Sequence, residues 1–511
     1  MKTKFLSMLT VFFLLCTSFV CAAEEEMITI TEKPIAVTYN GDAVMFPDAT
    51  PIIANGRTLV PVRAIMERAH LDVTFDEATR TVTATKDSFS ITMTLDNPSA
   101  EIIRNDERET VNMDEPACLI QGRTFVPVRF LAESLGVKVN WNPYAREVVL
   151  IDTAEWKQEI ASRSLYLNLL FDKPFVPAAP EAGNSATNIT LHYVSENVPD
   201  IDGTPKNWAA DLSLSSTETN VFDGKKGGSF ASVQAKLSQL MNIDPDFLNI
   251  MFKNPHLWTL SKLSKSHHLE IDSVYGTNRT KYIRSAGLAD IFRDLEQPAL
   301  ADQIAKQYVA FQPDELLSLF YTNIDFSNDA DVLSTAKSEW ELFETIILRD
   351  DMLYSRSVQS IDALLTAYMD LFDNSCFKTS RHWDGTYIRQ YNPAPTELKE
   401  NLLRISVLKN ALSGSPLDDV TYENQKKILQ NTDVSLKISL VSEMPEGTPF
   451  KSESSFSVKM KKQAIPDIEG ATREFTLEIQ TGESTRDFES KRDRRVVIPK
   501  NTVPFAELYK E

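Results

Sequence analysis

The sequence predicts an α+β protein. Its N-terminal domain is expected to be an antiparallel β-sheet-and-helix domain in two copies, followed by a larger α+β region with a helical block flanked by β-strands. Three observations predict this: an ungapped internal repeat in the first third, helical apolar spacing after residue 244, and two-residue alternation after residue 434. The elements follow in chain order.

Residues 1–23 have the features of a signal peptide. Lys2 and Lys4 form a charged start, and the apolar run Leu9–Leu15 is too short to cross a membrane. Small residues end the segment, so cleavage is expected before Glu24, and the mature protein is expected to be secreted or to lie in the cell envelope. Lipid attachment at Cys21 is a weaker alternative, because Val20 is bulky where a small residue is preferred.

The repeat is the clearest signal in the chain. The octapeptide Gly56–Arg63 returns as Gly122–Arg129, an offset of 122 − 56 = 66 residues that holds without a gap from Pro51 to Ala84. The repeated positions that we assign to the architecture of the domain are Gly56, Arg57, Pro61, Arg63 and Glu67 in the first copy, and Gly122, Arg123, Pro127, Arg129 and Glu133 in the second.

Each copy is predicted to begin with a hairpin. Asn55-Gly56 lies between apolar pairs, and Asn-Gly favours a two-residue turn with positive φ at both central residues. Gln121-Gly122 is a weaker version of the same turn. A helix is expected to begin at Pro61 and at Pro127, because the N–H of the first helical residue has no partner within the helix to lose.

The helix and the strands after it complete the unit. Gly136 is placed to end the second helix in the left-handed region, and His70 takes that place in the first copy. Alternating apolar residues then predict a half-buried strand and a closing strand. The pairs Arg63/Glu67 and Arg129/Glu133 have i,i+4 spacing, which indicates helix bracing, with ligand binding as the alternative.

These residues resemble a known family. The pattern Asn/Gln-Gly-Arg-Thr-x-Val-Pro-Val-Arg-x-x-x-Glu, then Val-x-Phe/Trp and a late Arg, resembles the copper amine oxidase N-terminal domain, or stalk domain, over roughly residues 27–152. The resemblance implies a module of secreted and envelope proteins of bacteria. In the oxidases the copper and the quinone belong to another domain, so no amine oxidase activity and no cofactor are expected here.

The net charge and the cysteines of the chain restrict the binding partners and the disulfides that are expected. The formal charge is −19, and loss of Lys2 and Lys4 makes it −21, which argues against general binding of nucleic acid. The expected partner is an unknown extracellular or envelope macromolecule. Of the four cysteines, Cys118 and Cys376 remain after cleavage, and a disulfide between them is not expected because it would have to join two domains.

Residues 153–187 are predicted to connect two domains. Asp152 to Glu155 has the spacing of a capping box, and an amphipathic helix is expected to continue through Phe171. Prolines and small residues then indicate a linker.

Residues 188–511 match no family that we recognise. Strands are expected over 188–241, although 230–241 fits a strand or a helix, with a hairpin favoured. Helices are expected over 244–431 and a β-meander over 434–498, and the early and late strands are expected to share a sheet. The predicted helical pieces are 285–296, 299–311, 313–324, 329–353, 355–374, 396–413 and 417–431.

No catalytic residue, cofactor or metal site is assigned from sequence motifs. His382 and Asp384 lie in a predicted loop with Cys376 and could supply metal ligands. The pattern Ser-x-x-Lys of some serine nucleophiles occurs at 334–337 and 406–409, but both matches lie in predicted helices and are explained by chance. The pair His267-His268 is explained more simply as exposed polar residues than as metal ligands. Asp325, Asp329 and Asp331 form part of a calcium-loop pattern but lack its Gly and distal Glu, and helix capping explains Asp329 more simply.

Two functions are weighed. The first is a secreted or cell-envelope non-catalytic protein, in which a stalk-like interaction or spacer domain carries a C-terminal domain that binds an unknown ligand. The alternative is a secreted hydrolase, glycosidase- or peptidase-like, whose carboxylates in 188–511 leave no local motif. A calcium- or copper-binding protein ranks third.

Overall fold

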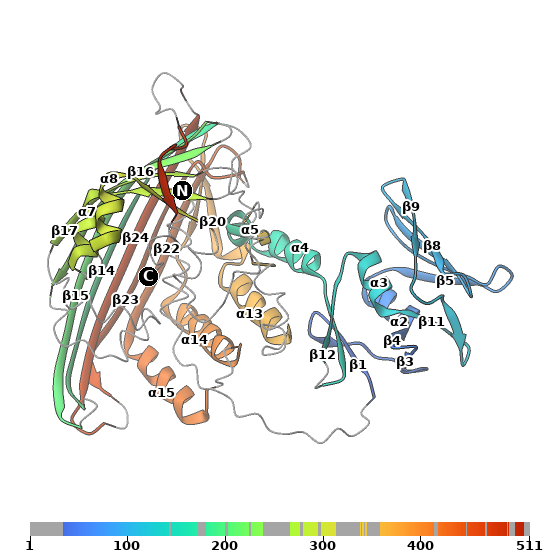
Figure 1. Ribbon diagram of the computed structural model, residues 1–511. Coiled ribbons are helices and arrows are strands. Elements are labelled where there is room, and N and C mark those ends of the chain that lie inside the picture. Colours follow the sequence, from blue (N-terminus) through green and yellow to red (C-terminus); the bar gives the residue numbers. More distant parts are fainter. Residues whose placement is uncertain are drawn as a thin grey trace. The chain divides into compact units, whose positions relative to one another are not determined.

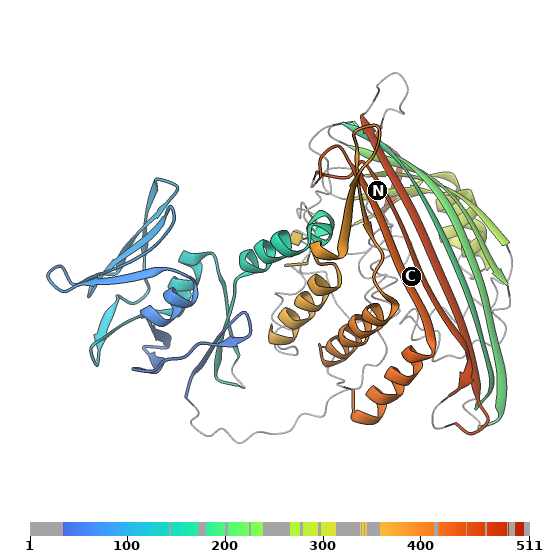
Figure 2. The same cartoon turned by 180° about the vertical axis from the view of Figure 1, so that it is seen from behind.

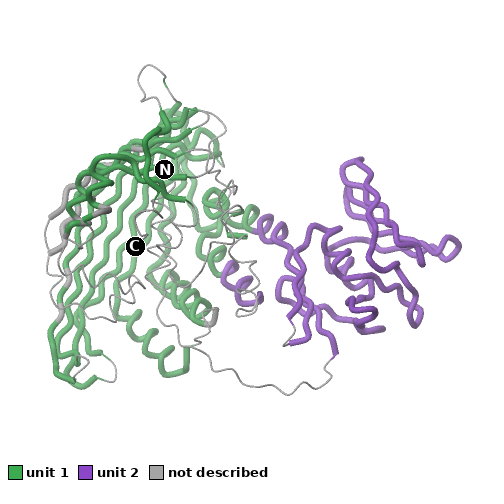
Figure 3. The backbone as a smooth tube through the Cα atoms, viewed as in Figure 1, with its two compact units in different colours: residues 1–21, 160–347, 367–511 green, residues 22–159, 348–366 purple. Residues whose placement is uncertain are grey.

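The computed structural model forms two compact units (Figure 3). Unit 1 comprises residues 1–21, 160–347 and 367–511, and unit 2 comprises residues 22–159 and 348–366. The residues described are 34–142, 145–171, 180–199, 203–223, 226–238, 266–275, 280–294, 298–312, 338, 340–341, 343–344, 358–412, 417–445, 447–465, 468–487, 489 and 496–504. The α+β class is confirmed: antiparallel sheets with few helices come first, and a larger region of helices and strands follows.

Unit 2 contains the two copies of the repeat. Its helices in these copies are α2 (Val62–Arg68) and α3 (Val128–Leu135). Its strands are β1 (Ala36–Tyr39), β2 (Asp42–Ala43), β3 (Ile52–Ala54), β4 (Arg57–Pro61), β5 (Asp72–Asp76), β6 (Thr81–Lys86), β7 (Phe89–Thr94), β8 (Ser99–Arg104), β9 (Glu107–Asn112), β10 (Cys118–Ile120), β11 (Arg123–Pro127), β12 (Lys138–Asn142) and β13 (Glu147–Ile151).

Local backbone geometry follows the sequence closely. Asn55 and Gly56 have φ values of 50° and 72°, and Gln121 and Gly122 have 50° and 74°, so both hairpin turns are confirmed. The helices begin directly after Pro61 and Pro127.

Left-handed residues end the helices and join the strands. His70 and Gly136, which end α2 and α3, have φ values of 63° and 73°. Arg80 and Arg146, another repeated pair, have 55° and 52° between the strands that follow. These positions repeat because both copies need the same turn.

The two copies share one sheet rather than folding separately, which differs from the expectation of a sheet wrapped on one helix in each copy. Four strands pair in the order β10-β11-β4-β3, and β4 pairs antiparallel with β11. Val60 lies opposite Val126, its own counterpart, since 60 + 66 = 126, while Pro61 faces Phe125 and Leu59 faces Pro127. The strands β4 and β11 are therefore related by a local pseudo-two-fold axis through this pair.

Two outer sheets complete unit 2. One has the order β12-β13-β1-β2, with β1 parallel to β13, and the other has the order β5-β6-β7-β8-β9. One core contains Ile65 and Met66 of α2 and Leu131 of α3. Phe75 is 38% exposed, so the strand after the first helix is less buried than its alternation predicts.

Unit 1 is dominated by one sheet of twelve strands among the described residues. Its order is β20-β21-β22-β23-β24-β14-β15-β16-β17-β18-β19-β25. The strands are β14 (Glu181–Pro199), β15 (Pro205–Phe222), β16 (Gly227–Ser238), β17 (Ser266–Tyr275), β18 (Lys281–Arg284), β19 (Tyr308–Phe311), β20 (Phe377–Arg381), β21 (Tyr387–Tyr391), β22 (Thr432–Ser442), β23 (Lys451–Ala464), β24 (Thr472–Asp487) and β25 (Thr502–Pro504).

The early and late strands share this sheet, as expected. The pairing of β14 with β24 runs from Glu181–Asp487 to Glu196–Thr472, and the long strands lie side by side (Figures 1 and 2). The ambiguous segment 230–241 lies largely in strand β16. Residues 496–498, at the end of the predicted meander, form no strand, and the last strand of the described residues is β25.

The expected helical block is wrong in part, because five strands, β17 to β21, lie between residues 244 and 431. These strands are short or carry polar residues, so their alternation is weak, and pairing within the sheet stabilises them. The described helices of unit 1 and those shared with unit 2 are α4 (Thr153–Arg163), α5 (Leu165–Phe171), α7 (Ala286–Asp294), α8 (Pro298–Lys306), α13 (Val358–Leu371), α14 (Pro395–Leu412) and α15 (Asp419–Gln430). The predicted pieces 313–324 and most of 329–353 fall outside the described residues.

The inner face of the sheet is the face on which β22 buries Val434, Leu436, Ile438 and Leu440. Helices α14 and α15 contact β22 (Figure 2). By register, Ile283 and Val309 also lie on this face, and they pack with α7 and α8. Apolar burial on this face is the core of unit 1.

Candidate functional site around helix α4

Helix α4 begins at a capping residue that the sequence indicated. Asp152 Oδ1 accepts a hydrogen bond from the backbone N–H of Glu155 at 3.0 Å, as a capping box requires. In a capping box the Glu155 side chain would accept a hydrogen bond from the N–H of Asp152. Here that N–H donates instead to Asn40 Oδ1 at 2.8 Å. The start of α4 is therefore tied to the turn between β1 and β2.

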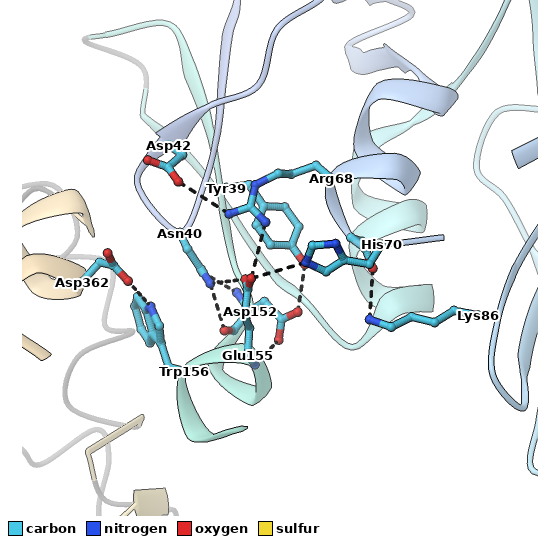
Figure 4. A network of polar contacts seen from close by, with 11 residues as sticks. Tyr39, Asn40, Asp42, Arg68, His70, Lys86, Asp152, Glu155, Trp156 and Asp362 are labelled. Carbon is cyan, nitrogen blue, oxygen red and sulfur yellow. Dashed lines mark hydrogen bonds and ion pairs between the residues drawn. The ribbon is translucent and has the colours of Figure 1, made fainter. Parts of the chain in front are cut away.

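The carboxylate of Glu155 is the centre of a polar network in unit 2 (Figure 4). It accepts a hydrogen bond from Asn40 Nδ2 at 2.8 Å, and Arg68 Nη1 lies 3.5 Å from it. His70 Nε2 lies 3.8 Å away on the same side. The end of α2 and the residues just after it thus supply a guanidinium and an imidazole to the first turn of α4.

Tyr39 completes the network from strand β1. Its hydroxyl donates to Asp152 Oδ2 at 2.8 Å, and the guanidinium of Arg68 lies 4.5 Å from the ring centroid. Burial, followed by the charge of Asp152, raises the pKa of Tyr39 far above its usual value. The phenol therefore stays protonated and acts as a permanent donor.

The first half of α13 belongs to unit 2 and contacts the same region. Trp156 Nε1 donates to Asp362 Oδ1 at 2.8 Å. Burial raises the pKa of Asp362, the Trp156 hydrogen bond opposes this, and the carboxylates of Glu159, Asp42 and Glu155 add to the rise. A Cβ atom on Gly41 would lie 2.4 Å from the Cα of Gln359, so the backbone of α13 touches the Asn40-Gly41 turn.

The predicted continuous helix from 153 to 171 is broken at Ser164. The Ser164 hydroxyl donates to the carbonyl of Phe372 at 2.7 Å and accepts from the N–H of Leu167 at 3.3 Å. It therefore caps α5 as a separate helix. Within unit 1, Arg163 at the end of α4 also pairs with Asp370 of α13.

The repeated arginines of the hairpins join the two copies. Arg57 Nε lies 3.1 Å from Asp114 Oδ2, and Arg123 Nη2 lies 2.7 Å from Asp48 Oδ2. Because 114 − 48 = 66, the two ion pairs are counterparts, and each arginine reaches the segment that precedes the other copy. These arginines act in the fold of the domain.

The helical pairs are weaker. Arg63 Nε and Glu67 Oε1 are 4.0 Å apart on an exposed surface, and their counterparts Arg129 and Glu133 form no ion pair in the described part of the chain. Exposed pairs of this kind contribute little to stability.

The His382 loop is a hairpin turn between β20 and β21. Asp384 Oδ1 accepts hydrogen bonds from the Thr386 N–H at 2.9 Å and the Thr386 hydroxyl at 2.6 Å, which lower the pKa of Asp384. His382 Nδ1 lies 3.3 Å from the same oxygen, and Trp383 is 89% exposed. Asp384 is therefore engaged in holding the turn.

The other candidates are not brought together. Asp325, Asp329 and Asp331 lie outside the described residues. Cys118 and Cys376 are free thiols. Across the described ranges, no three His, Cys, Asp or Glu side chains are placed to hold one metal ion.

Sequence reasoning missed two members of the network. Asn40-Gly41 repeats the Asn-Gly signal of the hairpins, with φ values of 49° and 89°, and could have been found by that dipeptide. Asp362 lies within a helical stripe and has no local signal.

No curated protein matches the chain. Within the described residues, no helix is long and apolar enough to cross a membrane. Residues 38–150 match the family model of the copper amine oxidase N-terminal domain, which confirms the resemblance inferred from the repeat.

Proposed function

We propose that this protein is exported and acts outside the cytoplasm without catalysing a reaction. Unit 2 serves as an interaction or spacer module, and unit 1 is the part that binds a ligand or partner. The observation that carries the proposal is the use of polar residues within unit 2: the repeated Arg57 and Arg123, and the Glu155 network outside the repeat, bond to other residues of this unit. In the described part of unit 2 these side chains hold the shape of the domain.

Export is supported by the first residues of the chain. Residues 1–23 have a charged start, an apolar centre and small residues before Glu24. The matched family adds weight, because modules of this type accompany secreted and envelope proteins.

A binding role for unit 1 is supported by the face of the sheet opposite the inner face. On it the middle strands expose small polar side chains, among them Asn184, Asn188 and Ser213. Two of them form cross-strand hydrogen bonds, Ser215 to Asn188 at 2.7 Å and Thr219 to Asn184 at 3.0 Å. This face offers a broad hydrogen-bonding surface to a macromolecule.

Export is tested by expressing the full chain with its own N-terminus in a bacterial host. Mass spectrometry of the mature protein should find Glu24 as the first residue, in the extracytoplasmic fraction. The variant Leu14→Arg breaks the apolar centre and should leave the precursor inside the cell. A wild-type protein that keeps Met1 in the cytoplasm would contradict the proposal.

The absence of catalysis is tested on the purified mature chain. Chromogenic glycosides, casein and primary amines with added Cu²⁺ should not be turned over. Steady turnover of a glycoside or peptide would instead support the hydrolase alternative. Binding is tested by sedimentation with isolated cell envelopes, where a protein that stays entirely in the supernatant would contradict the binding role.

A further inference from the structure

The inner face of the sheet changes its chemistry along the strands. The middle of the face is apolar and includes Leu191, Leu477 and Leu436. The end that begins β14, which we call the polar end, buries hydroxyl, amide and carboxylate groups on adjacent strands. Its members are Ser185, Thr187, Ser216, Glu218, Asn220 and Ser273, each between 2% and 7% exposed.

The register brings these side chains together. Ser185 of β14 lies opposite Glu218 of β15, and Asn220 lies opposite Gly183 on one side and Ser229 on the other. Ser229 in turn lies opposite Ser273 of β17. Residues opposite one another on neighbouring strands are within about 5.5 Å at Cβ, so Ser185 and Glu218 are close neighbours.

Two groups of the polar end have no hydrogen-bond partner among the described residues. They are the hydroxyl of Ser185 and the amide Nδ2 of Asn220. Both side chains are 7% exposed, so bulk water does not satisfy them. Buried polar groups in folded proteins nearly always have a partner, and an unsatisfied group costs free energy. These groups are placed to meet a molecule that the protein chain does not supply.

Tyr275 and Lys281 border the polar end. A Cβ atom on Gly227 would lie 1.8 Å from Cζ of Tyr275, so the ring lies across this glycine. Burial and the charges of Glu181 and Glu218 raise the pKa of Tyr275 to about 12, which keeps its hydroxyl protonated. Burial lowers the pKa of Lys281, and Glu218 opposes this. Both side chains are partly buried at the border of the polar end.

The charged side chains around the polar end determine which class of ligand fits it. Lys281 faces Glu218, and Glu181 and Glu483 lie on the same face, so an added anion would be repelled. A hydroxyl group both donates and accepts, which suits an amide N–H, a hydroxyl and a carboxylate together. We propose that the polar end of the inner face binds a small neutral polyhydroxylated molecule, a sugar or a polyol. This site lies on the face of the sheet opposite the surface proposed above for a macromolecule, and it is independent of that surface.

The test uses the mature full chain and a thermal-shift titration. Glucose, N-acetylglucosamine and glycerol are the probes, and gluconate is the anionic comparison. A neutral probe that binds the folded state should raise Tm saturably, whereas gluconate should not. Response to glycerol as well as the sugars indicates a polyol site, and response to a sugar alone indicates a sugar site.

Substitutions locate the site. Asn220→Leu removes the orphan amide at nearly constant volume, so it should abolish the ligand shift and leave the unliganded protein at least as stable as wild type. Ser185→Ala should weaken the shift. Asn188→Leu makes the same exchange on the opposite, exposed face and should preserve the shift.

Other outcomes overturn the inference. A wild-type protein that responds to none of the three neutral probes overturns it, as does an Asn220→Leu protein that keeps the full shift. A higher Tm of Asn220→Leu without any ligand response in wild type would assign the polar end to buried water only. These results leave export and envelope binding, which are measured separately, unaffected.

Discussion

The contact between α13 and the Asn40-Gly41 turn makes a sharp prediction for Gly41→Ala. Gly41 has φ of 89°, a conformation that costs an L-residue about 1–2 kcal/mol. The new Cβ would also lie 2.4 Å from the Cα and N of Gln359. Because both atoms are backbone, α13 must move, and overpacking of this kind costs about 1–3 kcal/mol. The expected loss is therefore about 2–5 kcal/mol.

Gly56→Ala is the matched control. Gly56 occupies the same position of another Asn-Gly turn, with φ of 72°, and a Cβ atom added to it would meet nothing within 4 Å. It therefore carries the conformational cost alone, about 1–2 kcal/mol. The difference between the two variants isolates the contact with Gln359.

Hydrogen exchange followed by mass spectrometry measures this difference locally. Peptides covering 36–43 and 358–366 report the two sides of the contact. An extra loss of about 1–3 kcal/mol corresponds to about 5- to 150-fold lower protection in Gly41→Ala than in Gly56→Ala. Equal protection of 358–366 in the two variants would refute the reasoning, because α13 would then not rest on the turn.

Two further predictions concern charge in unit 2. Asp362→Asn keeps an oxygen acceptor for Trp156 but removes a carboxylate whose pKa is raised in the folded state, so the folded protein binds the proton more tightly than the unfolded chain. The wild type should therefore gain stability as the pH falls through that raised pKa. In urea unfolding, Asp362→Asn should be more stable than wild type at neutral pH, and this difference in unfolding free energy should disappear in acid. A difference that does not change with pH would contradict this. A double-mutant cycle of Arg123→Ala and Asp48→Ala should give a coupling of about 0.2–1 kcal/mol that falls at high salt, and a coupling insensitive to salt would contradict an exposed ion pair.

Much of unit 2 could be predicted because its signals are local. Asn55-Gly56 and Gln121-Gly122 form their turns from their own φ preferences, and Gly136 ends its helix for the same reason. The repeat also indicated which positions matter. It did not reveal that Arg57 meets Asp114, because that contact joins the two copies.

The larger unit was harder to predict because its strands depend on their neighbours. Strand β17 contains His267, His268, Glu270 and Asp272, so its alternation is masked by polar residues. It forms because β16 and β18 flank it in the sheet. The break between α4 and α5 likewise depends on Ser164 reaching Phe372, far away in the chain.

The candidate site also contains residues that local spacing predicts and residues whose partners are distant in the chain. The capping residue Asp152 was predicted from spacing, since it bonds three residues away. Asp362 was not, since its partner Trp156 is 206 residues distant. The unpaired amide of Asn220 follows only from the register of the sheet.

By itself the sequence determined the repeat, the turns, the helix ends and the α+β class, because each depends on backbone preference or apolar spacing within a few residues. The tertiary structure alone decided which strands of the two copies pair, which carboxylates form ion pairs with which cations, and which polar groups are buried without a partner among the described residues. These depend on contacts between residues distant in the chain, which local spacing does not encode.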